Sequence, residues 1–174
     1  RLSLVGSEMC IRDRFNRLEV ISNMTIFKNL KEVENFVGKE LGTSDWHQIT
    51  QEQITKFGKV TGDEQWIHMK PMKSKMFSPF KNTIAHGFLV LSLLPKFLEK
   101  TYSIKSAKMG VNYGLNRVRF TAPVVVNSFV RGKVFLKEFI KIKKGAKLTV
   151  KVEIELKNST KPACVAEQVF LIYE

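Results

Sequence analysis

The sequence predicts a single α+β domain in which helices come first and a sheet of long strands follows. Between residues 29 and 98, apolar side chains recur at helical spacing or fill whole runs, whereas from residue 109 onward they alternate with polar side chains. Hydrophobic residues make up 44% of the chain, yet no apolar run approaches the roughly 20 residues of a membrane span. A soluble globular domain without membrane contact is therefore expected.

The first 23 residues are expected to lie outside that domain, as a disordered segment. The stretch LVGSEMCIRDR, residues 4–14, back-translates codon by codon into a sequence that resembles a sequencing-library transposon adapter read in frame. The following FNRLEVISN is either genuine or read-through from upstream of a start codon, and Met24 is a plausible natural start. Nothing here resembles a signal peptide. Residues 24–174 are therefore expected to form one domain.

Charge and cysteine content narrow the partners and the compartment. The formal net charge of +13 favours polyanionic partners such as the phosphates of a nucleotide-bearing substrate. Many lysines alternate with apolar residues, as in KLTVKVEIELK, where they form a solvated strand face, so specific nucleic-acid binding is not expected. Cys164 is the one cysteine beyond residue 23, which leaves no disulfide framework and favours a reducing, cytoplasmic environment.

Two amphipathic helices are predicted before residue 63. The first, in NLKEVENFVGKELG at residues 29–42, places Leu30, Val33 and Val37 on one side, and Gly42 follows its end. The second, in TQEQITKFGKVTG at residues 50–62, begins with a capping box and ends at a glycine. Its cap residues are Thr50, Gln53 and Gly62, and its apolar residues are Ile54, Phe57 and Val60. Asp63 is therefore expected just beyond a helix C-terminus.

A buried helix is predicted at the centre of the domain. The preceding stretch MKPMKSKMFSPFKNTIAHG, residues 69–87, is predicted to be irregular because Pro71 and Pro79 interrupt it. GFLVLSLLPKFL, residues 87–98, is apolar on nearly every side, which for a helix indicates burial all round. Pro95 should kink or end this helix because it removes a backbone donor.

Four long strands are predicted after that helix. They lie in MGVNYGLNRVRF, SFVRGKVFLKEFIKIK, AKLTVKVEIELK and ACVAEQVFLIY, where apolar and polar residues alternate. In the third run the even-numbered residues from Leu148 to Leu156 are apolar and face one way, and the polar residues between them face the other. A sheet with one apolar face needs a cover, and the helix beginning at Gly87 supplies it.

A candidate active site is suggested by TGDEQWIHMK, residues 61–70, which places a carboxylate and an imidazole five residues apart. Asp63 and His68 could hold and activate a water, and Gly87 at a helix start offers an unpaired N–H. Such a set suits the addition of water to a double bond conjugated to a thioester carbonyl. Taken singly, Asp63 is a turn residue and His68 a buried, hydrogen-bonded histidine; their occurrence together with AHG favours catalysis.

Three motifs in order carry a family resemblance: TGDEQWIH, PFKNTIAHGFLVLSLLP and VNYGLNRVRFTAPV. Together they resemble the MaoC-like dehydratase family of (R)-specific enoyl-CoA hydratases, and its nodulation protein N-like branch most closely. The likeness runs from about Gly38 to the C-terminus. It implies a hot-dog fold, in which an antiparallel sheet wraps a long central helix, and a homodimer with its active site near the subunit interface.

The resemblance also implies roles for individual residues. Asp63 and His68 match the family's catalytic pair, and the Gly87 N–H matches its oxyanion donor. Two positions depart from the pattern: HMK stands where many members have HxD, and Pro95 stands where some hydratases have serine. The second acid of HxD is therefore absent, and the details of the acyl pocket stay open.

The expected activity is that of a lyase that adds water to trans-2-enoyl-CoA to give (3R)-3-hydroxyacyl-CoA, or runs the reverse dehydration. The CoA thioester is the substrate, and no cofactor is expected. Two alternatives stay open: a hot-dog thioesterase that uses the same carboxylate and water, and a non-catalytic binder of acyl-CoA or a polyanion. The sequence leaves acyl chain length, CoA versus acyl-carrier protein, and reaction direction undetermined.

Seven further residues are candidates for contact with the substrate. Core packing is the alternative for the first three, a structural role for the fourth, and solvent exposure for the last three. They are Trp66, Ile67, Phe80, His86, Asn112, Tyr113 and Asn116. No metal site is expected, because the histidines, Asp63 and Cys164 show no paired-ligand spacing such as HxxxH or CxxC.

Overall fold

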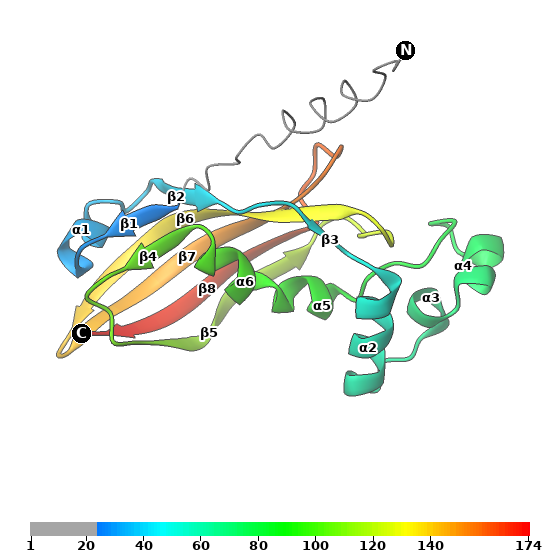
Figure 1. Ribbon diagram of the computed structural model, residues 1–174, viewed down its shortest axis with the longest axis horizontal. Helices are drawn as coiled ribbons and strands as arrows, with labels where there is room; N and C mark the ends of the chain where they lie inside the picture. Colours follow the sequence, from blue (N-terminus) through cyan, green and yellow to red (C-terminus); the bar gives the residue numbers. More distant parts are fainter. Residues whose placement is uncertain (1–23) are drawn as a thin grey trace, which may run out of the picture.

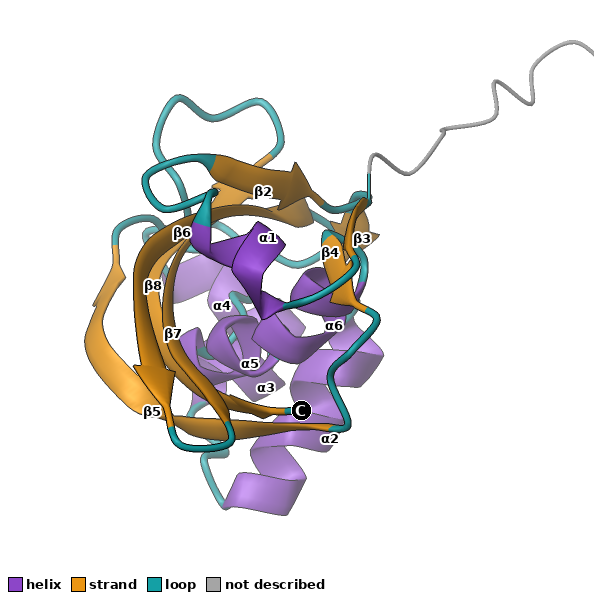
Figure 2. Ribbon diagram, turned by 90° about the vertical axis from the view of Figure 1, so that its left-hand side faces the viewer, coloured by secondary structure: helices purple, strands orange, loops and turns teal. Residues whose placement is uncertain are grey.

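The computed structural model describes residues 24–174, and the prediction made for residues 1–23 lies outside the described residues. The main feature is a six-stranded antiparallel sheet with the strand order β2-β6-β7-β8-β5, and β3 also pairs with β6. This sheet curls around helices α5 and α6 (Figure 1 and Figure 2). Its strands are β2 (Glu40–Thr43), β3 (His47–Gln48), β5 (Met109–Phe120), β6 (Phe129–Ile142), β7 (Gly145–Leu156) and β8 (Cys164–Tyr173).

The four predicted long strands are confirmed as β5, β6, β7 and β8. In β7 the even-numbered residues from Ala146 to Ile154 are fully buried against the helices, as the alternation predicts. Thr149 departs from the pattern because it is buried on the opposite face. Its hydroxyl donates to the Glu138 carboxylate at 3.0 Å, beside a β-bulge in β6.

The predicted central helix is present but broken into α5 (Gly87–Ser92) and α6 (Leu94–Glu99). Pro95 lies in the first turn of α6, where its missing N–H breaks no helical bond. The predicted effect of Pro95 is therefore confirmed, because the helix is interrupted between α5 and α6. Both helices bury apolar side chains against the sheet, and Gly132 of β6 permits the contact, because a Cβ there would lie 2.7 Å from the Phe97 Cβ.

Helix α2 (Gln51–Thr61) is confirmed with both predicted caps. Thr50 and Gln53 form the reciprocal capping box, and Gly62 adopts the left-handed conformation with φ 76°. The predicted apolar side is only partly right. Ile54 is fully buried, whereas Val60 is 87% exposed.

The first predicted helix was too long. Helix α1 spans only Leu30–Glu34, and Gly38 at φ 83° turns the chain into β2. Leu41 of β2 is buried in the core, while Val37, expected on the helix's apolar side, is 45% exposed. The pairing of β2 with β6 prevails over the local helical pattern, because it buries apolar side chains and gives the backbone of β2 hydrogen-bond partners in β6.

The stretch predicted to be irregular contains two short helices, α3 (Trp66–Met69) and α4 (Pro71–Phe77). Pro71 begins α4 rather than breaking it, since proline suits the first turn of a helix. Two short strands were also missed: β1 (Thr25–Phe27) and β4 (Tyr102–Ile104), which pair in parallel. None of the described helices combines the length and apolarity needed to cross a membrane.

Candidate active site

Three segments meet at the N-terminus of α5. Helix α2 ends at Gly62 and delivers Asp63, α3 carries His68, and the return loop reaches His86 immediately before Gly87. Gly58 lets α2 lie close to the other two segments. A Cβ at Gly58 would lie 2.8 Å from the Met69 Sδ and 2.9 Å from the Asp63 carbonyl oxygen, so no larger residue fits without movement.

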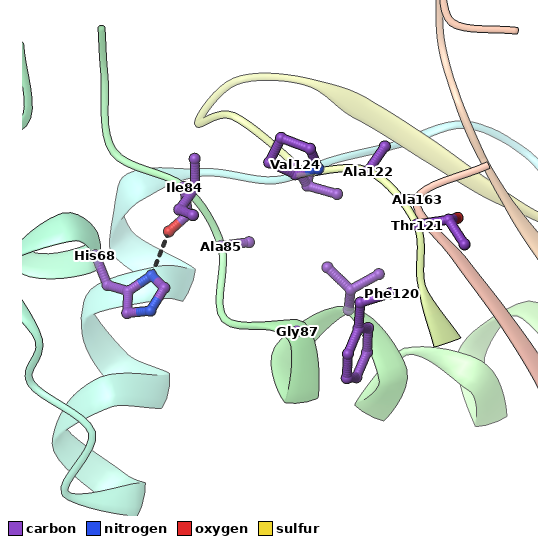
Figure 3. Close-up of a pocket in the computed structure, with 11 residues that line it drawn as sticks. His68, Ile84, Ala85, Gly87, Phe120, Thr121, Ala122, Val124 and Ala163 are labelled. Carbon is purple, nitrogen blue, oxygen red and sulfur yellow. Dashed lines mark hydrogen bonds between the residues drawn. The ribbon is translucent and has the colours of Figure 1, made fainter. Parts of the chain in front are cut away.

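The ring of His68 is held in one tautomer. It is 7% exposed, and its Nδ1–H donates to the carbonyl oxygen of Ile84 at 2.7 Å (Figure 3). This bond leaves the lone pair on Nε2. Burial lowers the pKa of His68 below its ordinary value; the Ile84 carbonyl opposes that effect, His86 adds to it, and Asp63 opposes it. At neutral pH the ring is therefore a neutral base.

His86 lies behind the pair and supports both members. Its ring is stacked on that of His68, with centroids 3.8 Å apart and planes inclined by 28°. Its Nε2–H donates to the backbone oxygen of Asp63 at 2.9 Å, which fixes the chain where Asp63 leaves α2. The other nitrogen, Nδ1, is buried and has no hydrogen-bond partner among the described residues. His86 therefore fixes the backbone of Asp63 through a hydrogen bond and packs against the face of the His68 ring.

Asp63 brings an exposed carboxylate to the same place. One potential ligand atom from each of Asp63, His68 and His86 lies within 4.8 Å of the others. The structure therefore brings together the two residues that the sequence singles out, across the five-residue spacing. A carboxylate and a neutral imidazole at this separation can share one water as acceptor partners.

The same three residues form a possible metal cluster that sequence spacing did not predict. Their geometry is poorly suited to an ion, however. A metal lies about 2.0–2.1 Å from an imidazole nitrogen and close to the ring plane. The His68 and His86 rings are stacked, with centroids 3.8 Å apart and planes inclined by 28°. Stacked rings direct their in-plane nitrogen lone pairs along different lines, so this cluster better suits a shared water than one ion held by both rings.

Gln51 ties the three segments together, and sequence reasoning did not find it. Its side-chain amide donates to the backbone oxygen of His68 at 2.8 Å and accepts from the Thr83 hydroxyl at 2.5 Å. Thr83 is fully buried in the return loop. The first turn of α2 therefore holds α3 and the return loop at fixed positions. Only the long-range contacts reveal this role, since Gln51 reads in sequence as an ordinary helix residue.

A cavity of about 310 Å³ opens beside His68. Gly87 and Val90 of α5, Phe120 at the end of β5, and the loop at residues 121–124 line it, and most of its lining is apolar (Figure 3). The Gly87 N–H is the first of α5 and makes no hydrogen bond to another described residue. A Cβ at Gly87 would lie 3.1 Å from the Phe120 ring, so glycine keeps this N–H accessible.

The other candidates are distributed differently. Trp66, Ile67, Phe80, Tyr113 and Asn116 do not line this cavity. Trp66 is covered by Lys73, whose Nζ lies 5.0 Å from the ring centroid, and Ile67 accepts the backbone N–H of Ile84. Tyr113 and Asn116 are exposed on β5. Asn112 lines a separate groove of about 460 Å³ between α5 and β5.

The chain is similar to known proteins over most of its length. The family described as MaoC like domain matches residues 32–158. A 3-hydroxyacyl-thioester dehydratase Z of Mycobacterium tuberculosis is 43% identical over 147 residues, which cover 84% of this chain and 97% of the relative. Nodulation protein N of Rhizobium leguminosarum bv. viciae is 41% identical over 155 residues, covering 83% and 91%.

Solved structures show the same fold. A monoamine oxidase regulatory protein from Archaeoglobus fulgius has a TM-score of 0.70 at 21% identity and covers 87% of this chain and 98% of its own. An R-hydratase from Pseudomonas aeruginosa has a TM-score of 0.62 at 21% identity, with coverages of 79% and 82%. The predicted hot-dog fold is therefore confirmed.

Proposed function

The chain belongs to the MaoC-like dehydratase family, and from that premise we propose that it is a hydro-lyase acting on trans-2-enoyl-CoA. The product is (3R)-3-hydroxyacyl-CoA, and the reverse reaction is the dehydration named for the Mycobacterium tuberculosis relative. One observation supports this proposal above the others. Asp63, the free nitrogen of His68 and the unpaired Gly87 N–H converge beside one largely apolar cavity.

The proposed reaction uses these groups in sequence. Asp63 and His68 hold a water and take up one of its protons, while the water oxygen forms a bond to the β-carbon of the enoyl group. The electrons of the double bond move to the thioester oxygen, where the Gly87 N–H stabilises the enolate. The proton held by the pair then passes to the α-carbon and restores the carbonyl. The net change is the addition of one water.

The neutral state of His68 suits this role. A base must be unprotonated to accept a proton, and burial lowers the pKa of His68 so that the ring is neutral at physiological pH. The Nδ1–H bond to Ile84 also directs the lone pair of Nε2 away from the return loop. Preorganised groups of this kind need little rearrangement when the transition state forms.

A homodimer is part of the proposal. Strand β5 is the last strand of the sheet, and its exposed apolar side chains include Met109, Val111, Tyr113 and Leu115, which are between 38% and 68% exposed. Natural proteins pair or cover such edges. Phe120 lines the cavity from the end of the same strand, so a partner paired with β5 would lie next to the active site.

Crotonyl-CoA tests the proposal against its two alternatives. A hydratase removes the enoyl absorbance without releasing free thiol, a thioesterase releases thiol, and a binding protein does neither. We expect loss of the enoyl absorbance alone, with the (3R) product identified by chiral chromatography. Release of CoA thiol at the rate of the absorbance change would instead identify a thioesterase that uses the same Asp63 and His68.

A further inference from the structure

Helix α4 turns its polar side inward and its apolar side outward. Ser74 is fully buried, and its hydroxyl donates to the Trp66 carbonyl of α3 at 3.2 Å. Met72 and Met76 lie two residues before and after Ser74, so at about 100° per residue both point away from the domain. Met72 is 75% exposed, Met76 66% and Phe77 68%. A helix that packs only on its own domain has the opposite arrangement, so this apolar surface suits a partner.

The surroundings of these apolar side chains are basic. No acidic residue occurs between Glu64 and Glu99 in the sequence, and four exposed lysines lie in or beside α4. Among the described residues, none of these four lysines forms an ion pair. The lysines and the three apolar side chains together are the α4 patch: Lys70, Met72, Lys73, Lys75, Met76, Phe77 and Lys81. This patch is complementary to a surface that is both acidic and apolar.

The α4 patch lies next to the candidate active site. Helix α3, which carries His68, packs against α4, and Figure 1 shows the two helices together at one end of the molecule. On the other side of α4, the loop at residues 78–86 contains Ile84, which lines the cavity beside His68. A protein docked on α4 would therefore lie close to the cavity in which its thioester reacts.

Charge and composition distinguish between the possible partners of the α4 patch. A second copy of the chain has the same net charge of +13 and would bring like charges together. The phosphates of CoA would pair with the lysines but offer nothing apolar to the three outward side chains. Membrane binding scales with buried apolar area, and a helix of seven residues offers little of it. An acidic protein with apolar side chains on the same face satisfies both parts of the patch, and methionine adapts well to such a partner.

We propose that the α4 patch docks an acidic carrier protein that holds the enoyl group as a thioester at the end of a flexible arm. The inference rests on the proposed hydratase function and names a second carrier for the same acyl group. The lysines of the patch attract the acidic face of the carrier protein, and the apolar side chains contact apolar residues on that face. The arm then places the enoyl group beside Asp63 and His68, where water is added as it is to the CoA thioester.

The test compares crotonyl-CoA with the crotonyl thioester of an acidic acyl carrier protein from a bacterial fatty-acid synthase. The parent should hydrate both, with the higher kcat/KM for the carrier thioester. In Lys70→Gln/Lys75→Gln/Lys81→Gln, kcat/KM for the carrier thioester should fall by roughly 3- to 100-fold through a higher KM, as for the loss of three exposed ion pairs. Met72→Gln/Met76→Gln should lower it by roughly 10-fold or more, because two apolar contacts are lost. Crotonyl-CoA hydration should be unchanged in both variants, which also shows that they fold.

Lys141→Gln/Lys143→Gln/Lys144→Gln is the matched control, because it removes the same charge from exposed lysines at the β6–β7 turn, outside the α4 patch. It should leave both kcat/KM values close to those of the parent. An equal fall in this control and in the α4 lysine variant would overturn the inference. An equal fall with both thioesters would overturn it too, because the lysines would then act on the phosphates of CoA.

Two further outcomes would contradict the docking of a carrier protein. If Met72→Gln/Met76→Gln dissociates the dimer in sedimentation, the patch binds a second copy of the chain and the inference is wrong. A parent kcat/KM that is no higher for the carrier thioester than for crotonyl-CoA overturns it without any variant. If the parent hydrates crotonyl-CoA but not the carrier thioester, only the inference fails, whereas failure with both thioesters removes the proposed function as well.

Discussion

Gly87→Pro should remove the proposed oxyanion donor while leaving the start of α5 intact. At the first helical position, the missing N–H of proline breaks no helical hydrogen bond, and its fixed φ suits the helix. His86 has φ −59° and ψ 137°, which is the extended conformation that a residue before proline prefers. The substitution therefore deletes one N–H at a position where the backbone already has the required shape.

Gly87→Ala is the control for the added Cβ, because both substitutions add that atom and only proline replaces the hydrogen of the N–H with a ring carbon. A Cβ at position 87 would lie 3.1 Å from the ring carbons of Phe120, so both variants press on that ring to a similar extent. Loss of one oxyanion donor lowers kcat by about 10²- to 10³-fold, or about 2.7–4 kcal/mol. We expect kcat of Gly87→Pro to lie roughly that far below kcat of Gly87→Ala.

The assay is crotonyl-CoA hydration, with kcat and KM measured separately and the melting temperature recorded for each variant. Because the N–H acts on charge that develops in the transition state, the loss should be larger in kcat than in KM. Equal kcat values in two variants with matching melting temperatures would refute the assignment of the Gly87 N–H as oxyanion donor.

Three more predictions concern the pair and the assembly. Asp63→Asn and His68→Gln should each slow crotonyl-CoA hydration by roughly 10²- to 10⁴-fold. The double variant should be only slightly slower than either single variant, since groups that hold one water act as a unit. The controls are Glu64→Gln and His47→Gln, which lie outside the cavity. Because burial lowers the pKa of His68, kcat/KM should be flat down to about pH 6.5 and fall only as pH drops through that lowered pKa, and a fall that begins well above pH 6.5 would contradict the neutral-base role. Sedimentation should show a dimer for the parent and a monomer for Tyr113→Lys, because a charge on the exposed β5 edge opposes strand pairing; a monomeric parent with full activity would rule the dimer out.

Local patterns predicted the elements whose stability is local. The β7 alternation and the Thr50 to Gln53 capping box depend on neighbouring residues, and both are present as predicted. The segment at residues 35–43 depends instead on β6, which lies far away in sequence. Leu41 is buried through the pairing of β2 with β6, so the helical pattern of that segment could not reveal its strand. Pro71 shows a different limit, since proline both breaks helices and begins them.

The sequence was enough to propose the two residues of the candidate pair, but not the contacts that hold them in place. Asp63 and His68 lie close together in sequence, and the five-residue spacing was enough to pair them. The contacts that position them come from other elements: Gln51 from α2, and Ile84 and His86 from the return loop.

Asp63 and His68 are held by different parts of their residues, and this difference decides which substitution reports on chemistry alone. The His68 ring donates through Nδ1 to the Ile84 carbonyl at 2.7 Å, so replacing the ring disturbs both the base and the return loop. Asp63 is fixed by its backbone oxygen, which accepts the His86 Nε2–H at 2.9 Å, and its carboxylate is exposed. Asp63→Asn therefore removes the charge and keeps the described hydrogen bonds of the site. A loss of rate in that variant measures the carboxylate itself.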